Sequence, residues 1–108
     1  MLSREHRYPF FQGVPENTYT TAYFTLRYRK RDGGGIRCAV VVGKKVHNLS
    51  NIRNRVKRVF TEKLAETMEN WDASYDLVFY LKKAVLDDDV EVWERSIRES
   101  LKKLGVVQ

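Results

Sequence analysis

Residues 44–60 read Lys-Lys-Val-His-Asn-Leu-Ser-Asn-Ile-Arg-Asn-Arg-Val-Lys-Arg-Val-Phe, and this stretch is the most informative part of the chain. Two lysines end an apolar run, and apolar side chains then recur at the spacing of a helix. We expect a helix over about residues 52–69, with Ser50 or Asn51 as its N-cap. Its outer face would be a row of cations, which suits phosphate and most plausibly a nucleic acid.

At about 100° per residue, the apolar side chains of this helix share one arc and the polar ones share the opposite arc. The apolar arc holds Ile52, Val56, Val59, Phe60 and Leu64. The polar arc holds Asn54, Lys57, Arg58 and Thr61, with Arg53 at the boundary. Arginine offers a planar donor fork to phosphate and lysine a point charge. Only Glu62 provides nearby acid compensation, so we interpret this face as binding nucleic acid rather than as an ordinary solvated surface.

The charge of the chain is unevenly distributed. Residues 1–63 hold 14 Lys/Arg and 4 Asp/Glu, a balance of +10, whereas residues 64–108 hold 6 and 10, a balance of −4. A merely soluble surface would intersperse the two signs. Segregation of this kind favours a polyanion-binding face in the first half of the chain.

The rest of the chain predicts an α+β domain. Residues 21–31 alternate as a strand, residues 32–35 (Asp-Gly-Gly-Gly) form a turn, and residues 36–43 form a central strand; we expect the two strands to pair as an antiparallel hairpin. Residues 75–81 read as a third strand, and residues 90–104 as a final helix. Gly105 is the expected stop of that helix.

Residues 1–20 carry the weakest pattern. Pro9, Gly13 and Pro15 argue against a long helix, although a short helical turn around residues 10–14 fits.

Length and composition favour one domain over residues 1–108. The lone Cys38 excludes an internal disulfide framework, and we interpret it as a buried strand thiol. No apolar run is long enough to span a bilayer or resembles a signal peptide, so we expect a cytoplasmic protein without membrane contact.

No catalytic set and no metal site is expected in this chain. The run at residues 87–89 (Asp-Asp-Asp) precedes a helix, where carboxylates favour the helix dipole. His47 and His6 lack partners at ligand spacing. Lys44 and Lys45 extend the basic face instead, and the basic and aromatic residues of 23–31 suit either unpaired bases or a charged edge strand.

An apolar strand, Lys-Lys, a loop and then Arg-Asn-Arg-Val-Lys-Arg resemble the bacterial ribonuclease P protein subunit. The resemblance implies an α-β sandwich in the order α-β-β-β-α-β-α, with a small, mostly antiparallel sheet, a basic helix, a C-terminal helix and a left-handed βαβ crossover. It implies a protein subunit of an endoribonuclease whose RNA performs catalysis with Mg²⁺. The implied partners are ribonuclease P RNA and precursor tRNA, whose 5′ leader is removed.

The resemblance also implies roles for particular residues. The RNA-binding positions would be Lys44, Lys45, Arg53, Asn54, Arg55, Lys57 and Arg58. The leader-binding positions would be Phe11, Tyr23, Phe24 and Arg27, of which Tyr23 or Phe24 would compensate for Pro15, which stands where a second cleft aromatic is expected. Thr61 stands where the family often has another arginine, which predicts one RNA contact fewer.

Three other functions compete with this one. The first is a free-standing, ribosome-associated RNA-binding module without a nuclease role. The second is a protein-only nuclease that uses the carboxylates of residues 87–89. A DNA-binding helix-turn-helix protein is disfavoured, because strands flank the basic helix and no helix is expected to pack across it.

Overall fold

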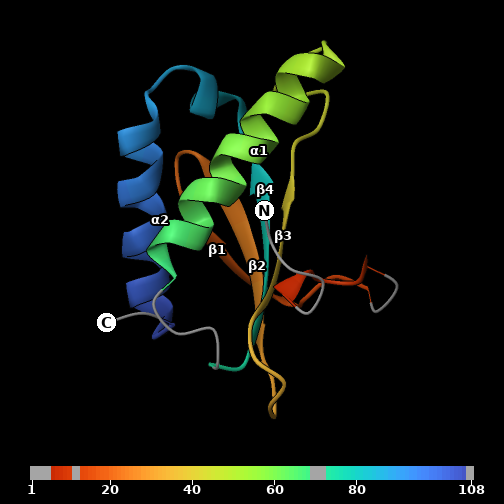
Figure 1. Ribbon diagram of the computed structural model, residues 1–108, viewed down its shortest axis with the longest axis vertical. Coiled ribbons are helices and arrows are strands. Elements are labelled where there is room, and N and C mark those ends of the chain that lie inside the picture. The colour runs from red at the N-terminus through yellow and green to blue at the C-terminus, as the bar shows by residue number, and fades with distance from the viewer. Residues whose placement is uncertain (1–5, 11–12, 69–72, 107–108) are drawn as a thin grey trace.

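The computed structural model describes residues 6–10, 13–68 and 73–106 of the chain. The elements are β1 (Asn17–Thr20), β2 (Phe24–Lys30), β3 (Arg37–Val41), α1 (Ser50–Thr67), β4 (Tyr75–Leu81), the short 3₁₀ helix η3 (Lys83–Leu86) and α2 (Val90–Leu104). Both helices pack on the same face of the sheet (Figure 1). The expected α+β class is therefore confirmed.

The sheet has four strands in the order β1-β2-β4-β3. β1 pairs with β2 and β2 with β4 in antiparallel fashion, whereas β3 and β4 are parallel. In Figure 1, β3 and β4 run upward, α1 crosses in front of the sheet, and β4 lies to the left of β3. The crossover through α1 is therefore left-handed, against the strong general preference for right-handed connections.

The expected hairpin between residues 21–31 and 36–43 is wrong. β2 and β3 do not pair with each other, because β4 lies between them and pairs with both. Strands adjacent in sequence usually pair, which favoured the hairpin. The turn itself is as expected, since Gly33, Gly34 and Gly35 all have positive φ. β4 rather than β3 is a central strand, and the burial of most of its side chains reflects this position.

Helix α1 spans 18 residues and begins two residues before the expected start. Its N-cap is Leu49, which makes no side-chain capping hydrogen bond, so the prediction of Ser50 or Asn51 as N-cap is wrong. A side-chain hydrogen bond lies instead within the loop before the helix, where the Leu49 N–H donates to His47 Nδ1 at 3.0 Å. The buried stripe is as predicted, with Val56, Phe60 and Leu64 buried.

Aromatic rings join the helices to the sheet. Phe24 and Phe79 of neighbouring strands lie 5.1 Å apart between ring centroids, and Phe60 of α1 lies 5.8 Å from Phe24. Trp93 of α2 lies 6.2 Å from Phe60, and its indole N–H donates to the Val85 carbonyl oxygen at 2.9 Å. Edge-on and tilted ring contacts of this kind add to the burial energy and fix the position of α1 on the sheet.

The second half of the chain matches the sequence expectation most closely. β4 and α2 have the expected bounds, and Gly105 ends α2 with φ 80°. Asp89 is the N-cap of α2, and its side chain accepts a hydrogen bond from the Val92 N–H. The acidic run at residues 87–89 therefore lies at the N-terminus of α2 and stabilises it, as the helix-dipole interpretation predicted.

One charged residue is fully buried in β4. Asp76 is 0% exposed and pairs with Arg37 at 2.9 Å and Arg29 at 2.9 Å, while the Nε of Arg31 lies 3.7 Å away. Burial by itself would raise the pKa of this carboxyl, but the bonds from Arg37 and Arg29 outweigh it and hold the pKa below its ordinary value. The ion cluster ties β2, β3 and β4 together at one end of the sheet.

This cluster predicts a specific loss of stability in acid. Because the folded-state pKa of Asp76 lies below its unfolded value of about 3.8, its stabilisation is complete above that value and disappears as pH falls through the lower folded value. We expect the urea midpoint to fall below about pH 4 by more in the wild type than in an Asp76→Asn variant. Parallel curves for the two proteins between pH 2 and 6 would contradict this role.

Candidate nucleic-acid interface

The outer face of α1 carries the predicted cations. Asn54, Arg55, Lys57 and Arg58 are exposed, which is where the helical spacing places them. Arg53 is half-buried, and its Nη1 donates to the carbonyl oxygens of His47 at 3.0 Å and Asn48 at 2.8 Å. Arg53 therefore also anchors the loop that precedes the helix.

A cleft of about 930 Å³ separates α1 from the sheet edge and the N-terminal segment. Its cationic wall is formed by Arg53, Asn54, Lys57 and Arg58 of α1. Its floor is β3 and the residues after it, through Val42, and its opposite wall includes Tyr8 and Phe10. The cleft thus places donors for phosphate opposite aromatic rings, an arrangement that suits an unpaired nucleic-acid strand.

The aromatic wall is built by the N-terminal segment along the outer edge of β3. Arg7 forms a parallel bridge with Cys38, and the Tyr8 N–H donates to the Cys38 carbonyl oxygen at 3.0 Å. The Gly13 N–H donates to the Phe10 carbonyl oxygen at 2.9 Å, while residues 11 and 12 of the expected short helical turn lie outside the described residues. Residues 6–10 and 13–20 contain no α-helix of the kind that the resemblance implies, although His6 and Phe10 are in 3₁₀-helical conformation.

Lys44 and Lys45 are exposed but line a second hollow, of about 330 Å³. Lys83 lines this hollow too, although it was not among the predicted RNA-binding residues. The signal was available: Lys83 follows β4, and because β4 is parallel to β3, the residues after both strands meet at one end of the sheet. Because the predicted hairpin paired residues 36–43 with residues 21–31, it did not place Lys83 near Lys44 and Lys45. The loop held by Arg53 connects the second hollow to the cleft.

The predicted leader-binding residues do not form one group. Phe11 lies outside the described residues. Phe24 is fully buried among the core aromatics, so its assignment as a contact residue is wrong. The period of two had placed Phe24 with Leu26 on one face, and that face packs against the helices.

Tyr23 and Arg27 are half-buried, and neither lines the cleft. The Tyr23 hydroxyl donates to Asp88 Oδ2 at 2.6 Å, and the Arg27 Nε donates to the Pro15 carbonyl oxygen at 2.8 Å. Thr61 lines the cleft, but its hydroxyl donates to the Lys57 carbonyl oxygen at 2.7 Å. A leader contact by Tyr23 or Arg27 stays a prediction.

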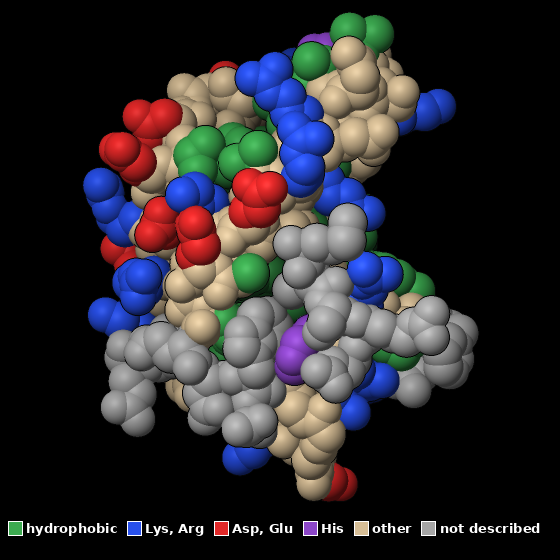
Figure 2. Space-filling view, in the orientation of Figure 1, with side chains coloured by type: hydrophobic (Ala, Val, Ile, Leu, Met, Phe, Trp, Pro, Cys, Tyr) green, Lys and Arg blue, Asp and Glu red, His purple; other side chains and the backbone are tan. Residues whose placement is uncertain are grey.

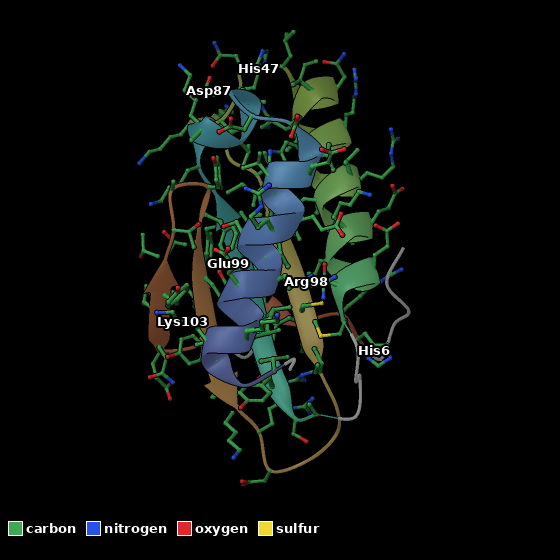
Figure 3. All side chains as sticks on the ribbon, turned by 90° about the vertical axis from the view of Figure 1, so that its left-hand side faces the viewer. His6, His47, Asp87, Arg98, Glu99 and Lys103 are labelled. Carbon is green, nitrogen blue, oxygen red and sulfur yellow. The ribbon has the colours of Figure 1, made fainter. Side chains whose placement is uncertain are left out.

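The described part of the chain contains no group of three His, Cys, Asp or Glu side chains that could hold a metal ion. His47 lies at the same end of the molecule as Asp87, whereas His6 lies far from both (Figure 3). Asp88 accepts the Tyr23 hydroxyl and Asp89 caps α2, so the acidic run has structural partners. Burial raises the pKa of the Cys38 thiol to about 12, which makes it a poor nucleophile near neutral pH.

Acidic side chains are concentrated toward one side of the surface. Figure 2 shows them on the side where α2 packs, where Lys and Arg side chains lie among them, whereas Lys and Arg side chains predominate along the other side of α1. Lys63 marks the boundary, since its Nζ lies 3.1 Å from Glu66 and 3.9 Å from Glu94. The side of α1 away from these acidic side chains is therefore the more cationic one.

A mixed four-stranded sheet with a left-handed crossover, beside a cationic cleft, defines a small α+β nucleic-acid-binding protein. A family model described as Ribonuclease P matches residues 2–105, and the chain belongs to this family. It is accordingly a protein component of the endoribonuclease ribonuclease P, with a role in the 5′ maturation of tRNA.

Two curated relatives are similar to this chain in sequence over most of its length. The ribonuclease P protein component of Clostridium botulinum strain Langeland is 33% identical over 105 residues, which cover 96% of this chain and 91% of the relative. The component from strain Alaska E43 is 29% identical over 93 residues, which cover 83% of this chain and 74% of the relative.

Solved structures share the fold. The Staphylococcus aureus RNase P protein superposes with a TM-score of 0.69 at 16% identity, covering 92% of this chain and 88% of that one. The RNase P protein from Thermotoga maritima gives a TM-score of 0.63 at 21% identity, covering 91% and 93%. In the described part of this chain, no helix has the length and apolar character needed to cross a membrane.

Proposed function

We propose that this chain docks on ribonuclease P RNA through the outer face of α1 and holds the 5′ leader of precursor tRNA in the cleft. The observation that carries the proposal is the cleft itself, with Lys57 and Arg58 on one wall and Phe10 on the other. Phosphates of the catalytic RNA would bind the exposed cations, including Arg55, which is exposed but does not line the cleft. Phosphates and bases of the leader would occupy the space between the two walls.

The role of each cation follows from its position. Lys57 and Arg58 are exposed and line the cleft, so they can neutralise phosphate directly. Asn54 supplies a donor and an acceptor that suit a ribose hydroxyl. Arg53 contributes charge to the cleft and holds the loop that carries the second hollow. Lys44 and Lys45 would extend the phosphate-binding surface beyond the cleft.

In this proposal the RNA subunit binds Mg²⁺ and performs hydrolysis. The donor set fits such a division, because Glu62 is the one carboxylate among the described residues that line the cleft. The protein would lower the Mg²⁺ requirement by neutralising phosphates, which otherwise attract cations. We place this work in the cytoplasm. No observation favours the free-standing RNA-binding module.

The proposal is tested by the leader dependence of substrate affinity. A holoenzyme assembled from this chain and a bacterial ribonuclease P RNA transcript is titrated with precursor tRNA and with mature tRNA that lacks the leader. We expect the protein to strengthen binding of the precursor and to leave binding of mature tRNA nearly unchanged. Equal strengthening of both would show that the leader does not bind in the cleft.

The second hollow gives a separate prediction. Lys83→Ala should weaken binding of the ribonuclease P RNA transcript severalfold and lower the slope of log K against log salt by about 1, because one phosphate contact is lost. Fluorescence anisotropy at four or more salt concentrations measures both quantities. Lys30→Ala is the matched control, because Lys30 is an exposed lysine at the other end of the sheet from Lys83. An equal effect of both variants would mean that only net charge matters.

A further inference from the structure

The N-terminal segment carries a contact chain that the RNA-binding surface does not explain. Tyr8 is 4% exposed, although it belongs to a short segment outside the sheet. Its hydroxyl donates to the Gly13 carbonyl oxygen at 2.7 Å, and its N–H donates to β3. Tyr8 therefore joins Gly13 to β3 through hydrogen bonds of its side chain and its backbone.

The ring of Tyr8 contacts two groups of different chemistry. The guanidinium carbon of Arg37 lies 5.5 Å from its centroid, within the range of a cation–π interaction. The Phe10 ring lies 5.4 Å away with an interplanar angle of 88°, an edge-on aromatic pair. Phe10 is itself 47% exposed and lines the cleft, and the Tyr8 ring against which it packs is buried.

Arg37 is in turn held by Asp76. Its Nε and Nη2 reach the two carboxylate oxygens at 2.9 Å and 3.1 Å, which is a bidentate pair with fixed geometry. Because Asp76 is fully buried, Arg37 has little freedom to move. The contact chain thus runs from Asp76 in β4 through Arg37 and Tyr8 to Phe10 in the cleft.

We propose that Tyr8, held by the Arg37–Asp76 pair, is a positioning residue that sets Phe10 in place to stack on an unpaired base of the 5′ leader. This inference rests on the proposed leader binding and names the residues that prepare one wall of the cleft. It also assigns a role to the buried ion cluster beyond stability. A ring fixed before binding costs less conformational entropy when the leader arrives. Tyr8 need not touch the leader itself.

The test uses the reconstituted holoenzyme with precursor tRNA and leaderless mature tRNA. Tyr8→Leu should weaken binding of the precursor about tenfold, the size of one lost base–aromatic stacking contact, and leave mature tRNA binding unchanged. Tyr8→Phe keeps the ring and should retain most of the affinity. Tyr75→Leu is the matched control, because Tyr75 is half-buried and bonds the Leu104 carbonyl oxygen far from the cleft.

A double-mutant cycle separates positioning from direct contact. If Tyr8 acts through Phe10, Tyr8→Leu should have almost no further effect on precursor binding in a Phe10→Ala background. Additive losses in the double variant would overturn the inference, as would full precursor affinity in Tyr8→Leu or an equal loss for mature tRNA. If the wild-type holoenzyme itself shows no leader dependence, the proposed leader binding fails and this inference fails with it. If only the variants behave differently from expectation, the positioning role alone fails.

Discussion

Replacing Lys57 and Arg58 together by alanine should weaken binding to ribonuclease P RNA by about 10- to 100-fold at low salt, since each of the two lost contacts costs about 0.7–1.4 kcal/mol, within the usual net range of a hydrogen bond, and each 1.4 kcal/mol is tenfold. Both side chains are exposed on the cationic wall, and neither contributes to the buried stripe of α1. The helix should therefore remain folded while the RNA contact is lost.

The salt dependence distinguishes contact from general attraction. The slope of log K against log salt should fall by about 2, one for each phosphate contact removed. Lys102→Ala/Lys103→Ala removes the same charge from the exposed end of α2 and should change the slope little. If the two double variants weaken binding equally, the cationic wall is not the docking face. Arg53 is left intact here, because its bonds to the preceding loop would mix a structural loss with a lost contact.

Removing the charge of Asp76 should have the largest effect on stability. Asp76→Asn leaves three arginines without their buried counter-ion, and breaking a buried pair from one side costs about 3–5 kcal/mol. The arginine side chains are 16% to 32% exposed, so water compensates part of the loss and we expect the lower end of that range, about 3 kcal/mol. For a domain of this size, such a loss lowers the melting temperature by roughly 10 °C or more.

Differential scanning calorimetry at pH 7 measures this effect. Asp32→Asn is the control, since Asp32 is an exposed carboxylate in the loop next to the same arginines. A similar small shift for both variants would show that the cluster contributes little. According to the proposed positioning role, Asp76→Asn should also weaken precursor binding under conditions where the variant is fully folded.

The parts of the structure that sequence predicted well are those with local causes. The bounds of β4 and α2 follow from apolar periodicity and from the residues at their ends, with Gly105 as the stop. The two arcs of α1 follow from helical geometry, so Val56 is buried and Arg58 is exposed. Local spacing decides these features before any tertiary contact forms.

The parts that sequence missed depend on which strands become neighbours. The left-handed crossover brings β4 between β2 and β3; the family resemblance implied this crossover, but no local pattern specifies which strands it makes neighbours. Because the predicted hairpin paired β3 with β2 instead of β4, Lys83 was not included in the predicted basic surface. Phe24 was misassigned because its strand is covered by helices on one face, which alternation alone does not identify. Strand β1 was not predicted, since its four residues are mostly exposed and lack an apolar face.

The aromatic wall of the cleft was not predicted from the sequence, for a different reason. The resemblance implied a cleft aromatic at Phe11, which lies outside the described residues, and Pro15 stands where it implied a second one. Among the described residues, Phe10 and Tyr8 line the cleft. Their position depends on the Arg37–Asp76 pair, whose members are separated by 39 residues in sequence. Cooperation of this kind cannot be derived from spacing within the N-terminal segment.

The central claim is that this chain activates a catalytic RNA by neutralising phosphates rather than by chemistry of its own. Its most direct test is the cleavage of precursor tRNA by a bacterial ribonuclease P RNA transcript at low Mg²⁺, with and without the protein. We expect little cleavage by the RNA alone, strong stimulation by the wild-type chain, weak stimulation by Lys57→Ala/Arg58→Ala, and no cleavage by the protein alone. Absence of stimulation at any Mg²⁺ concentration, or cleavage by the protein without RNA, would contradict the account.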